Sequence, residues 1–256
     1  MDRGALNSHF FMQIRPKISV VIPAHNEEHV IAATLKAVLA QKYPDFEVIV
    51  VDNASTDRTS AIVSQFPVKL VHESKKGLLH AREAGRRAAT GEIIVNIDAD
   101  CLPEPDWLTT GEKLFEKSSI VAVTGPYDYH DGKPSFRKVS LIMQKYVYIP
   151  VNSFLQLPFV RAGAILTGGN NFIRADVLDK VGGYNTDLTF YGEDSDTAKR
   201  VSFHGKVIFS PKIVMKTSAR RFIKEGTAQI AAKYWFHFFK VVFGGSKKYR
   251  NHSIKH

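Results

Sequence analysis

The chain has 256 residues, of which 44% are hydrophobic; this is enough to bury the core of one large α/β domain, and it excludes a mainly disordered protein. The single cysteine, Cys101, excludes an internal disulfide and a cysteine-based metal cluster, and it predicts a reducing compartment. The formal net charge of +10 predicts anionic partners such as nucleotide phosphates or lipid headgroups, but the basic residues are scattered, so we expect no nucleic-acid partner.

Residues 1–16 are interpreted as an N-terminal tail. Their sequence, "MDRGALNSHFFMQIRP", lacks the sustained apolar run of a signal peptide. No later stretch offers a charge-free run long enough to span a bilayer. These absences predict a cytoplasmic protein.

From Lys17 onward, short β-branched runs alternate with helical stretches. Strands are predicted at 18–24, 46–52, 68–73 and 92–98, and helices at 27–41, 58–66 and 78–89. Runs of Val and Ile without polar alternation are typical of strands covered on both faces. The pattern therefore predicts an α/β fold with a mostly parallel, Rossmann-like sheet and flanking helices. A dinucleotide-binding site is disfavoured because no glycine occurs between Gly4 and Gly77.

Polar residues follow the predicted strands, at the edge where open α/β sheets bind ligands. Asn26 and Glu27 follow the first strand, Asp52 the second, and Asp98 and Asp100 the fourth. Two carboxylates one residue apart repel unless a cation lies between them, and their oxygens suit Mg²⁺ or Mn²⁺. The alternative is that these residues cap helices and brace loops. That alternative is weakest for Asp52, which comes directly off a buried strand.

The second half has a looser pattern. Residues 136–160 are nearly all apolar and predict a helix that ends before Pro150, with burial under the sheet as one open possibility. The stretch "LTGGNNFIR", 166–174, places paired glycines beside two asparagines, where a backbone can approach a ligand closely. In "YGEDSD", 191–196, acidic residues crowd the start of a predicted helix, which the helix dipole alone would also favour.

The last predicted helix runs from Thr227 to Phe243. It places Lys233, His237 and Lys240 on one narrow stripe, surrounded by aromatic and apolar side chains. Such an amphipathic helix, followed by further basic residues, suits the surface of an anionic membrane. Packing against the domain, or against a second copy, is the alternative.

Taken in order, "VVIPAHNEE", "VIVVDNASTD", "GLLHARE", "NIDADC", "GGNNF", "GGY" and "GEDSD" resemble the inverting glycosyltransferases of family 2, which have the GT-A fold. The resemblance covers about residues 17–221. It implies a GT-A domain over 17–222, with a nucleotide-binding half at 17–125 and an acceptor-binding half at 126–222. Residues 223–256 would form an amphipathic, membrane-associated C-terminal segment.

The resemblance also implies a nucleotide-sugar site. Its residues would be Pro23, Ala24, Asn26, Glu27, Asp52, Arg82, Asp98, Ala99 and Asp100. Asp52 would read the uracil ring, and Arg82 would approach the base and the phosphates. Asp98 would lie near the ribose, while Asp100 would ligate a metal, Mn²⁺ or Mg²⁺, on the diphosphate. Glu83 stands where many members have asparagine, which leaves the nucleotide contact there open.

The catalytic and acceptor side is implied in the same way. Asp194 corresponds to the catalytic base, and Glu193, Gly169 and Asn170 would lie on the acceptor side. In "TSARRF", 217–222, either Arg220 or Arg221 would contact the diphosphate.

The activity implied is transfer of a sugar, with inversion, from a nucleotide-diphosphate donor, a uridine nucleotide by resemblance, to a hydroxyl of a glycan or lipid-linked glycan. The enzyme would be peripheral on the cytoplasmic face of a membrane, bound through its C-terminal helix. Transfer to a polyprenyl phosphate is an alternative, and a non-catalytic nucleotide-sugar-binding module is a further one. The sugar, the acceptor and the oligomeric state stay open.

Overall fold

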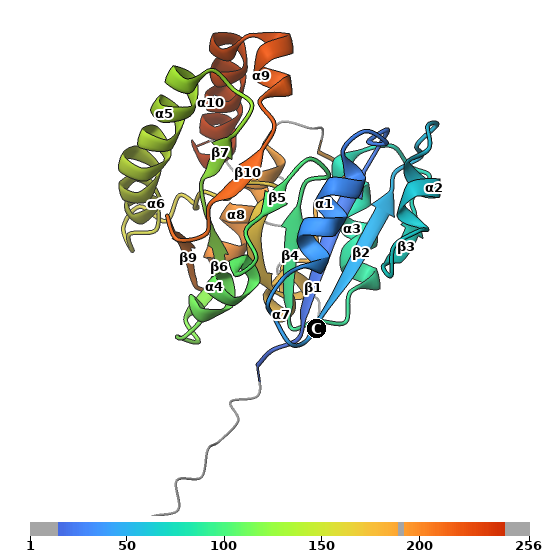
Figure 1. Cartoon of the computed structure of the whole chain (residues 1–256). Helices are drawn as coiled ribbons and strands as arrows, with labels where there is room; N and C mark the ends of the chain where they lie inside the picture. The colour runs from blue at the N-terminus through green and yellow to red at the C-terminus, as the bar shows by residue number, and fades with distance from the viewer. Residues whose placement is uncertain (1–14, 189–191, 244–256) are drawn as a thin grey trace, which may run out of the picture.

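The central layer of the molecule is a seven-stranded sheet in the order β3-β2-β1-β4-β8-β6-β9 (Figure 1). The structure is a computed structural model that describes residues 15–188 and 192–243. The strands are β1 (Ile18–Ala24), β2 (Phe46–Asp52), β3 (Lys69–His72), β4 (Ile93–Ile97), β6 (Ile120–Thr124), β8 (Asn170–Arg174) and β9 (Lys206–Phe209). β8 runs antiparallel to both neighbours, and the other paired strands are parallel. The predicted mostly parallel sheet is therefore confirmed.

Helices cover both faces of this sheet, which explains why its strands lack polar alternation. On one face lie α1 (Ile31–Leu39), α2 (Thr59–Val63) and α4 (Trp107–Lys113), and on the other α3 (Leu78–Ala88), α7 (Ala175–Lys180) and α8 (Glu193–Ser202). Within β1, Val20 and Ile22 pack into one buried cluster and Val21 into the other. Apolar side chains on both faces are what a strand between two helical layers requires.

A second, three-stranded sheet brings distant segments to the same edge. It consists of β5 (Leu102–Pro103), β10 (Met215–Thr217) and β7 (Tyr127–Tyr129), with β10 in the middle. β10 pairs with β5 in antiparallel register and with β7 in parallel register. Because β5 follows Asp100 and β10 precedes α9 (Arg220–Glu225), this sheet places the basic segment beside the paired carboxylates.

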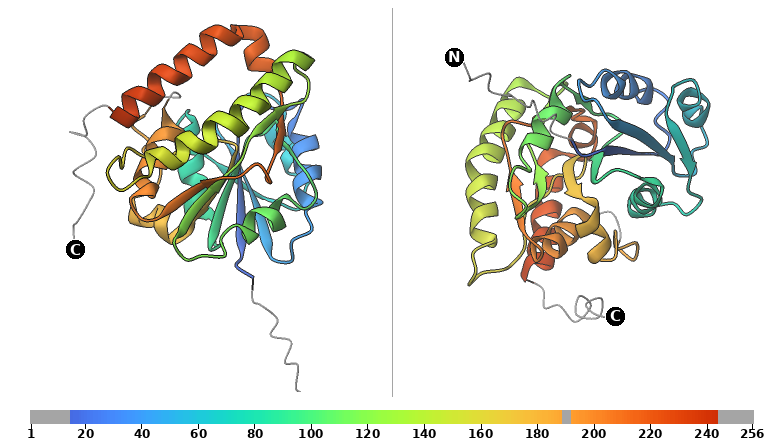
Figure 2. Two further views of the ribbon diagram at one scale, coloured as in Figure 1. Left: turned by 90° about the vertical axis from the view of Figure 1, so that its left-hand side faces the viewer. Right: turned by 90° about the horizontal axis from the view of Figure 1, so that it is seen from below.

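The apolar stretch at 136–160 forms one continuous helical rod on the outside of the molecule (Figure 2). It consists of α5 (Pro134–Met143), a π-helical turn η1 (Gln144–Tyr148) and α6 (Ile149–Leu155). The prediction that the helix ends before Pro150 is wrong: the proline lies in the first turn of α6, directly after the wider π turn, where the regular hydrogen-bond ladder is already interrupted. Burial under the sheet is also wrong for α5, which has no buried residue.

Helix α10 spans Thr227–Phe243, as predicted. Only Ile230 and Val242 of this helix are buried. Within the described residues, none of the helices combines the length and apolar character needed to cross a bilayer. Residues 1–14 of the predicted tail, Tyr191 of the acidic motif and the basic residues beyond 243 lie outside the described residues.

Candidate active site

The loops after β1 and β2 hold each other at the carboxyl edge of the sheet. The backbone N–H of Asn26 donates to Ser55 Oγ (3.0 Å), and that of Glu28 donates to Asp57 Oδ2 (3.1 Å). Helix α1 begins only at Ile31 and has no side-chain cap. Side chains of the second loop therefore hold the backbone of the first loop, and no side chain of the first loop caps α1.

Asp52, at the end of β2, is tied into its own loop. Its carboxylate accepts hydrogen bonds from the Ser55 N–H (3.1 Å) and the Ser60 hydroxyl (2.5 Å). Burial would raise the pKa of Asp52, but these hydrogen bonds outweigh it and lower the pKa. The side chain is an ionised, buried acceptor at the edge of the candidate site.

A single cavity of about 820 Å³ runs along this edge of the sheet. Of the residues predicted from the sequence, it is lined by Pro23, Ala24, Glu27, Arg82, Asp98, Ala99, Asp100, Glu193, Asp194, Arg220 and Arg221. Four predicted residues, Asn26, Asp52, Gly169 and Asn170, are not part of its lining. The structure thus brings together both predicted halves of the site, donor side and acceptor side, around one space.

Several lining residues were missed by the sequence analysis. His25 and Asn53 lie inside the loops that the analysis identified, but nothing in their spacing marks them out. Lys76 immediately precedes Gly77, the glycine before α3. A cation at that position could have been predicted from the sequence as part of a site for an anionic ligand. Tyr127 and Tyr129 come from the three-residue strand β7, which is too short to give a periodic pattern.

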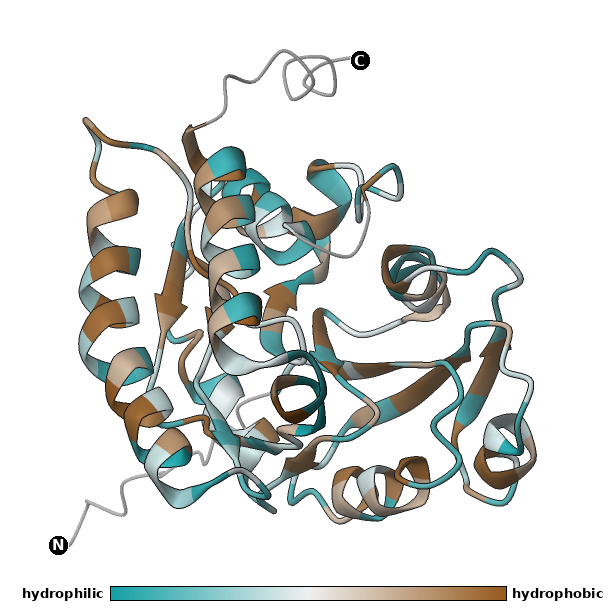
Figure 3. Ribbon diagram, turned by 90° about the horizontal axis from the view of Figure 1, so that it is seen from above, coloured by the Kyte–Doolittle hydropathy of each residue, from teal (hydrophilic) through white to brown (hydrophobic). Residues whose placement is uncertain are grey.

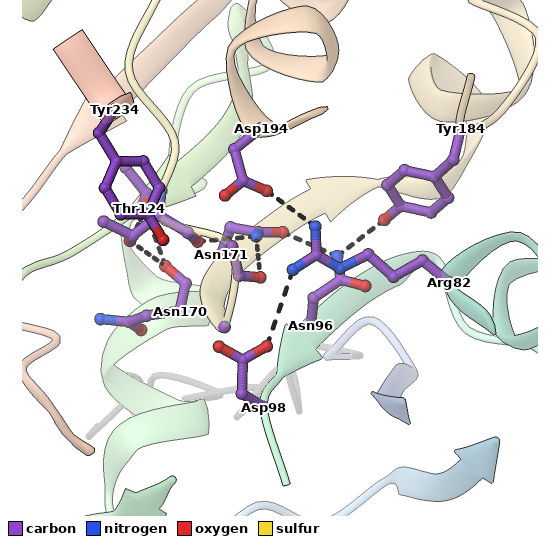
Figure 4. A network of polar contacts seen from close by, with 12 residues as sticks. Arg82, Asn96, Asp98, Thr124, Asn170, Asn171, Tyr184, Asp194 and Tyr234 are labelled. Carbon is purple, nitrogen blue, oxygen red and sulfur yellow. Dashed lines mark hydrogen bonds and ion pairs between the residues drawn. The ribbon is translucent and has the colours of Figure 1, made fainter. Parts of the chain in front are cut away.

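Arg82 connects the two sides of the cavity (Figure 4). From α3, its Nη1 donates to Asp194 Oδ1 at 2.7 Å, and its Nη2 lies 3.7 Å from Asp98 Oδ1. Burial alone would lower the pKa of Arg82, but the charges of Asp194 and Asp98 outweigh it and raise the pKa. This buried cation keeps two carboxylates, from α8 and from the end of β4, facing one point. Its Nε is buried without a hydrogen-bond partner among the described residues.

The paired glycines make this convergence possible. A Cβ at Gly168 would lie 2.5 Å from Arg82 Nη2 and 2.7 Å from Asp194 Oδ2. A Cβ at Gly169 would lie 2.4 Å from Asp98 Cγ and 2.7 Å from the Asp98 backbone nitrogen. These glycines therefore allow a close approach to the charged side chains of the site, and the predicted approach to a ligand stays a prediction.

Glu193 lies beside Asp194 at the start of α8 and is almost fully buried. Burial, together with the negative charge of Asp194, raises the pKa of Glu193 to about 8. The charge of Arg82 works in the opposite direction but does not compensate. Glu193 therefore keeps its proton to a higher pH than a carboxyl group in water does.

Asp98, Asp100 and Cys101 bring one ligand atom each within 4.8 Å of one another. Burial raises the pKa of Asp98 to about 6, raises that of Asp100, and raises that of the Cys101 thiol well above its usual range. Arg220 compensates part of the acidic charge, since its Nε lies 3.1 Å from Asp100 Oδ2 and its Nη atoms donate to Glu27 at 2.6 and 2.7 Å. Two carboxylates whose negative charge is only partly compensated are suitable ligands for a hard divalent cation, whereas a protonated thiol is not.

The amides of "GGNNF" support the site from beneath. Asn170 is fully buried: its Oδ1 accepts from Trp107 Nε1 (3.0 Å), and its Nδ2 donates to backbone carbonyls. Asn171 accepts from Asn96 Nδ2 (2.8 Å), which also donates to the Tyr184 hydroxyl (2.7 Å). The position of Asn170 gives no support to its predicted place on the acceptor side.

Glu83, the departure from the family pattern, points away from the cavity. Its carboxylate accepts from Arg86, Arg87 and the backbone N–H of Tyr184. These contacts tie α3 to the segment after α7. The nucleotide side of the cavity is therefore lined without it.

A mostly parallel sheet, two carboxylates after β4 and an acidic helix start across one cavity define an α/β fold of the GT-A class. The protein-family model described as Glycosyl transferase family 2 matches residues 19–182 of the sequence. The chain belongs to glycosyltransferase family 2.

Three known proteins are similar to this chain in sequence or structure. Glycosyltransferase AglE from Haloferax volcanii is 27% identical over 218 residues, which cover 81% of this chain and 68% of AglE. Beta-monoglucosyldiacylglycerol synthase from Nostoc sp. is 29% identical over 196 residues, or 68% of this chain and 41% of that protein. The solved structure of mannosyltransferase PcManGT from Pyrobaculum calidifontis, in complex with GDP-Man and Mn²⁺, has a TM-score of 0.71 and 28% identity, covering 91% of this chain and 66% of PcManGT. The chain thus spans 41% to 68% of the lengths of these relatives.

Proposed function

We propose that the protein transfers a sugar, with inversion, from a nucleotide-diphosphate donor to a hydroxyl of a glycan or lipid-linked glycan. The observation that carries this proposal is the continuous cavity in which Arg82 joins Asp98, on the donor side, to Asp194, on the acceptor side. The donor side corresponds to residues 17–125 and the acceptor side to 126–222. The resemblance favours a uridine nucleotide, whereas PcManGT was solved with GDP-Man.

In this mechanism, Asp194 accepts the proton of the acceptor hydroxyl. The acceptor oxygen forms a bond to the anomeric carbon, and the bond from that carbon to the diphosphate oxygen breaks on the opposite face, which inverts the configuration. Arg82 holds the Asp194 carboxylate in place, and Arg220 or Arg221 offers positive charge to the departing diphosphate.

Asp98 and Asp100 would hold a divalent metal, Mn²⁺ or Mg²⁺, as their distance and charge allow. When bound, such an ion supplies Lewis-acid neutralisation of charge on the leaving diphosphate. The Mn²⁺ in PcManGT supports this assignment.

We further propose that the enzyme is peripheral on the cytoplasmic face of a membrane, bound through α10 and the C-terminal segment 223–256. The exposed aromatic side chains of α10 support this placement. The Nostoc relative is named for a glucosyl diacylglycerol product, which supports a lipid-borne acceptor. Transfer to a polyprenyl phosphate is the second candidate, because an acceptor that is already anionic has less need of a base.

The test measures release of nucleoside diphosphate from uridine, guanosine and thymidine diphosphate sugars with Mn²⁺ or Mg²⁺. With a hydroxyl acceptor, Asp194→Asn should lower turnover by roughly 10²–10⁴-fold, because the general base is lost. Asp176→Asn, a change at an exposed carboxylate that pairs with Lys180, is the matched control. Retention of the donor's anomeric configuration in the product, or full turnover by Asp194→Asn with a hydroxyl acceptor, contradicts the mechanism.

A further inference from the structure

The cavity continues past Asp194 into a channel between two helices. One wall is the rod α5–η1–α6 and the other is α10, and the two run side by side in Figure 3 and in the left view of Figure 2. We call this part the apolar groove; it is lined by Val139, Met143, Tyr148, Ile165, Trp235 and Phe238. These side chains offer no charge, so the groove suits an apolar chain far better than a sugar chain.

Contacts between the surrounding elements mark the two ends of the groove. At one end Leu155, Ala162 and Val242 form a buried cluster that joins α6 to the end of α10. At the other end the ring of Phe136 lies 5.2 Å from that of Phe222. Between these ends, Val139 lines the cavity and is still 59% exposed. The groove therefore has an opening to the outside at Val139, which we call its mouth.

Exposed apolar side chains flank this mouth on both helices. On the rod, Val139, Ile142, Met143 and Tyr146 follow one another at helical spacing, and on α10 Phe236, Phe239 and Phe243 do the same; each of the seven is at least 41% exposed. A contiguous apolar surface of this kind marks an interaction site. Figure 3 shows apolar colour along both helices.

The two helical walls carry basic residues and no acidic ones. Residues 133–161 contain five basic residues, Lys133, Arg137, Lys138, Lys145 and Arg161, and no Asp or Glu. Helix α10 adds Lys233 and Lys240, again without a carboxylate. Arg137 pairs with Asp128 and Lys233 with Glu225 from neighbouring segments. The other basic residues of the two walls, next to apolar side chains, match an anionic bilayer, in which acyl chains lie directly beneath negative headgroups.

We propose that the acceptor is a lipid that stays in an anionic bilayer during transfer, with its hydroxyl beside Asp194 and its apolar chain in the apolar groove. The proposal rests on the proposed function and narrows its acceptor to a molecule with an apolar chain. It also makes α5–η1–α6 a second membrane-contacting element alongside α10. A lipid chain in the groove would enter directly from the bilayer because the mouth and the flanking side chains face the same surface.

The two tryptophans make a direct test possible. Trp235 lines the groove, whereas Trp107 is 2% exposed and packs against Phe172 in the core. Vesicles of phosphatidylcholine and phosphatidylglycerol with brominated acyl chains should quench the fluorescence of Trp235 on binding. Vesicles without bromine, and the Trp235→Phe protein, are the controls and should show no such quenching.

Two double variants test whether the basic residues of the rod contact the bilayer. Lys138→Gln combined with Lys145→Gln removes two exposed cations of the rod and should weaken binding to these vesicles by about tenfold or more. Lys42→Gln combined with Lys117→Gln removes two exposed cations that precede β2 and β6, at the opposite edge of the sheet, and should leave binding unchanged.

Three outcomes overturn the inference: absence of vesicle binding, binding without quenching of Trp235, or equal weakening by both lysine pairs. Self-association in sedimentation without vesicle binding would assign the apolar surface to a second copy instead. Donor hydrolysis, measured in the same samples, separates these failures from failure of the proposed function. If nucleoside diphosphate is still released while the vesicles stay unbound, the lipid acceptor is wrong and the transferase stands.

Discussion

At the scale of single residues, the site is a balance between carboxylates and two arginines. Arg82 and Arg220 each contact two carboxylates from different elements, and Asp98 and Glu193 still keep pKa values raised above the ordinary range. The site thus has more buried acid than buried base. Such a surplus suits a cavity that receives a cation and a diphosphate together.

The raised pKa of Glu193 predicts a pH dependence of stability. The folded protein binds the proton of Glu193 more tightly than the unfolded chain does. The stabilisation that Glu193 gives to the folded state is therefore present below about pH 4.5 and is lost as the pH rises toward 8. Across that window the free energy of unfolding should fall by up to about 1.4 kcal/mol per pH unit through this group. The glutamine of Glu193→Gln has no proton to lose, so the free energy of unfolding of this variant should fall less steeply with pH.

Urea unfolding of both proteins at pH 5.5, 7 and 8.5 measures this difference. Asp98 titrates in both, so its contribution cancels in the comparison. Parallel curves for the two proteins would show that Glu193 is not held neutral by the fold.

At the scale of elements, the loop between Thr167 and β8 decides whether the site can form. Gly169→Ala would place a Cβ against the backbone nitrogen of Asp98, which cannot move without displacing the end of β4. We expect at least a tenfold loss of donor hydrolysis and about 1–3 kcal/mol of lost stability.

The control for this prediction is Gly226→Ala. That glycine has φ +88 but nothing within 4 Å of its added Cβ, so only backbone strain of about 1 kcal/mol is expected, with donor hydrolysis retained. If both variants lose stability equally and both remain active, the close approach at Asp98 does not matter for the site.

At the scale of the whole molecule, the cavity is walled by segments from 23 to 238, so a ligand there adds contacts between parts of the chain that are far apart in sequence. A nucleoside diphosphate with Mn²⁺ should therefore stabilise the fold. At about 100 times the dissociation constant, the gain is about 2.7 kcal/mol, or several degrees in Tm.

Thermal unfolding with uridine and guanosine diphosphate, with and without chelator, measures this gain. Asp100→Ala should abolish the metal-dependent part of the shift, since it removes a proposed metal ligand. An unchanged shift in Asp100→Ala, or in chelator, would show that the nucleotide binds without help from these carboxylates.

The sequence alone determined much of the architecture and the edge where the site lies. Apolar runs without alternation predicted β1, β2 and β4, and the residues after them, such as Glu27, Asp98 and Asp100, do line the cavity. These features are local: periodicity reports which faces of an element are buried, and strand ends mark the ligand edge.

Only the tertiary structure decided which residues meet there. Arg82 reaches Asp194 across 112 positions of the chain, Asn170 turns inward to Trp107, and Trp235 and Val139 line the same groove. No local pattern encodes such contacts, because the apolar face of a helix requires a partner but does not specify which one. Packing between distant segments decided three further features: the antiparallel position of β8, the continuation of the helical rod past Pro150, and the meeting of Arg82 and Asp194 beside Gly168.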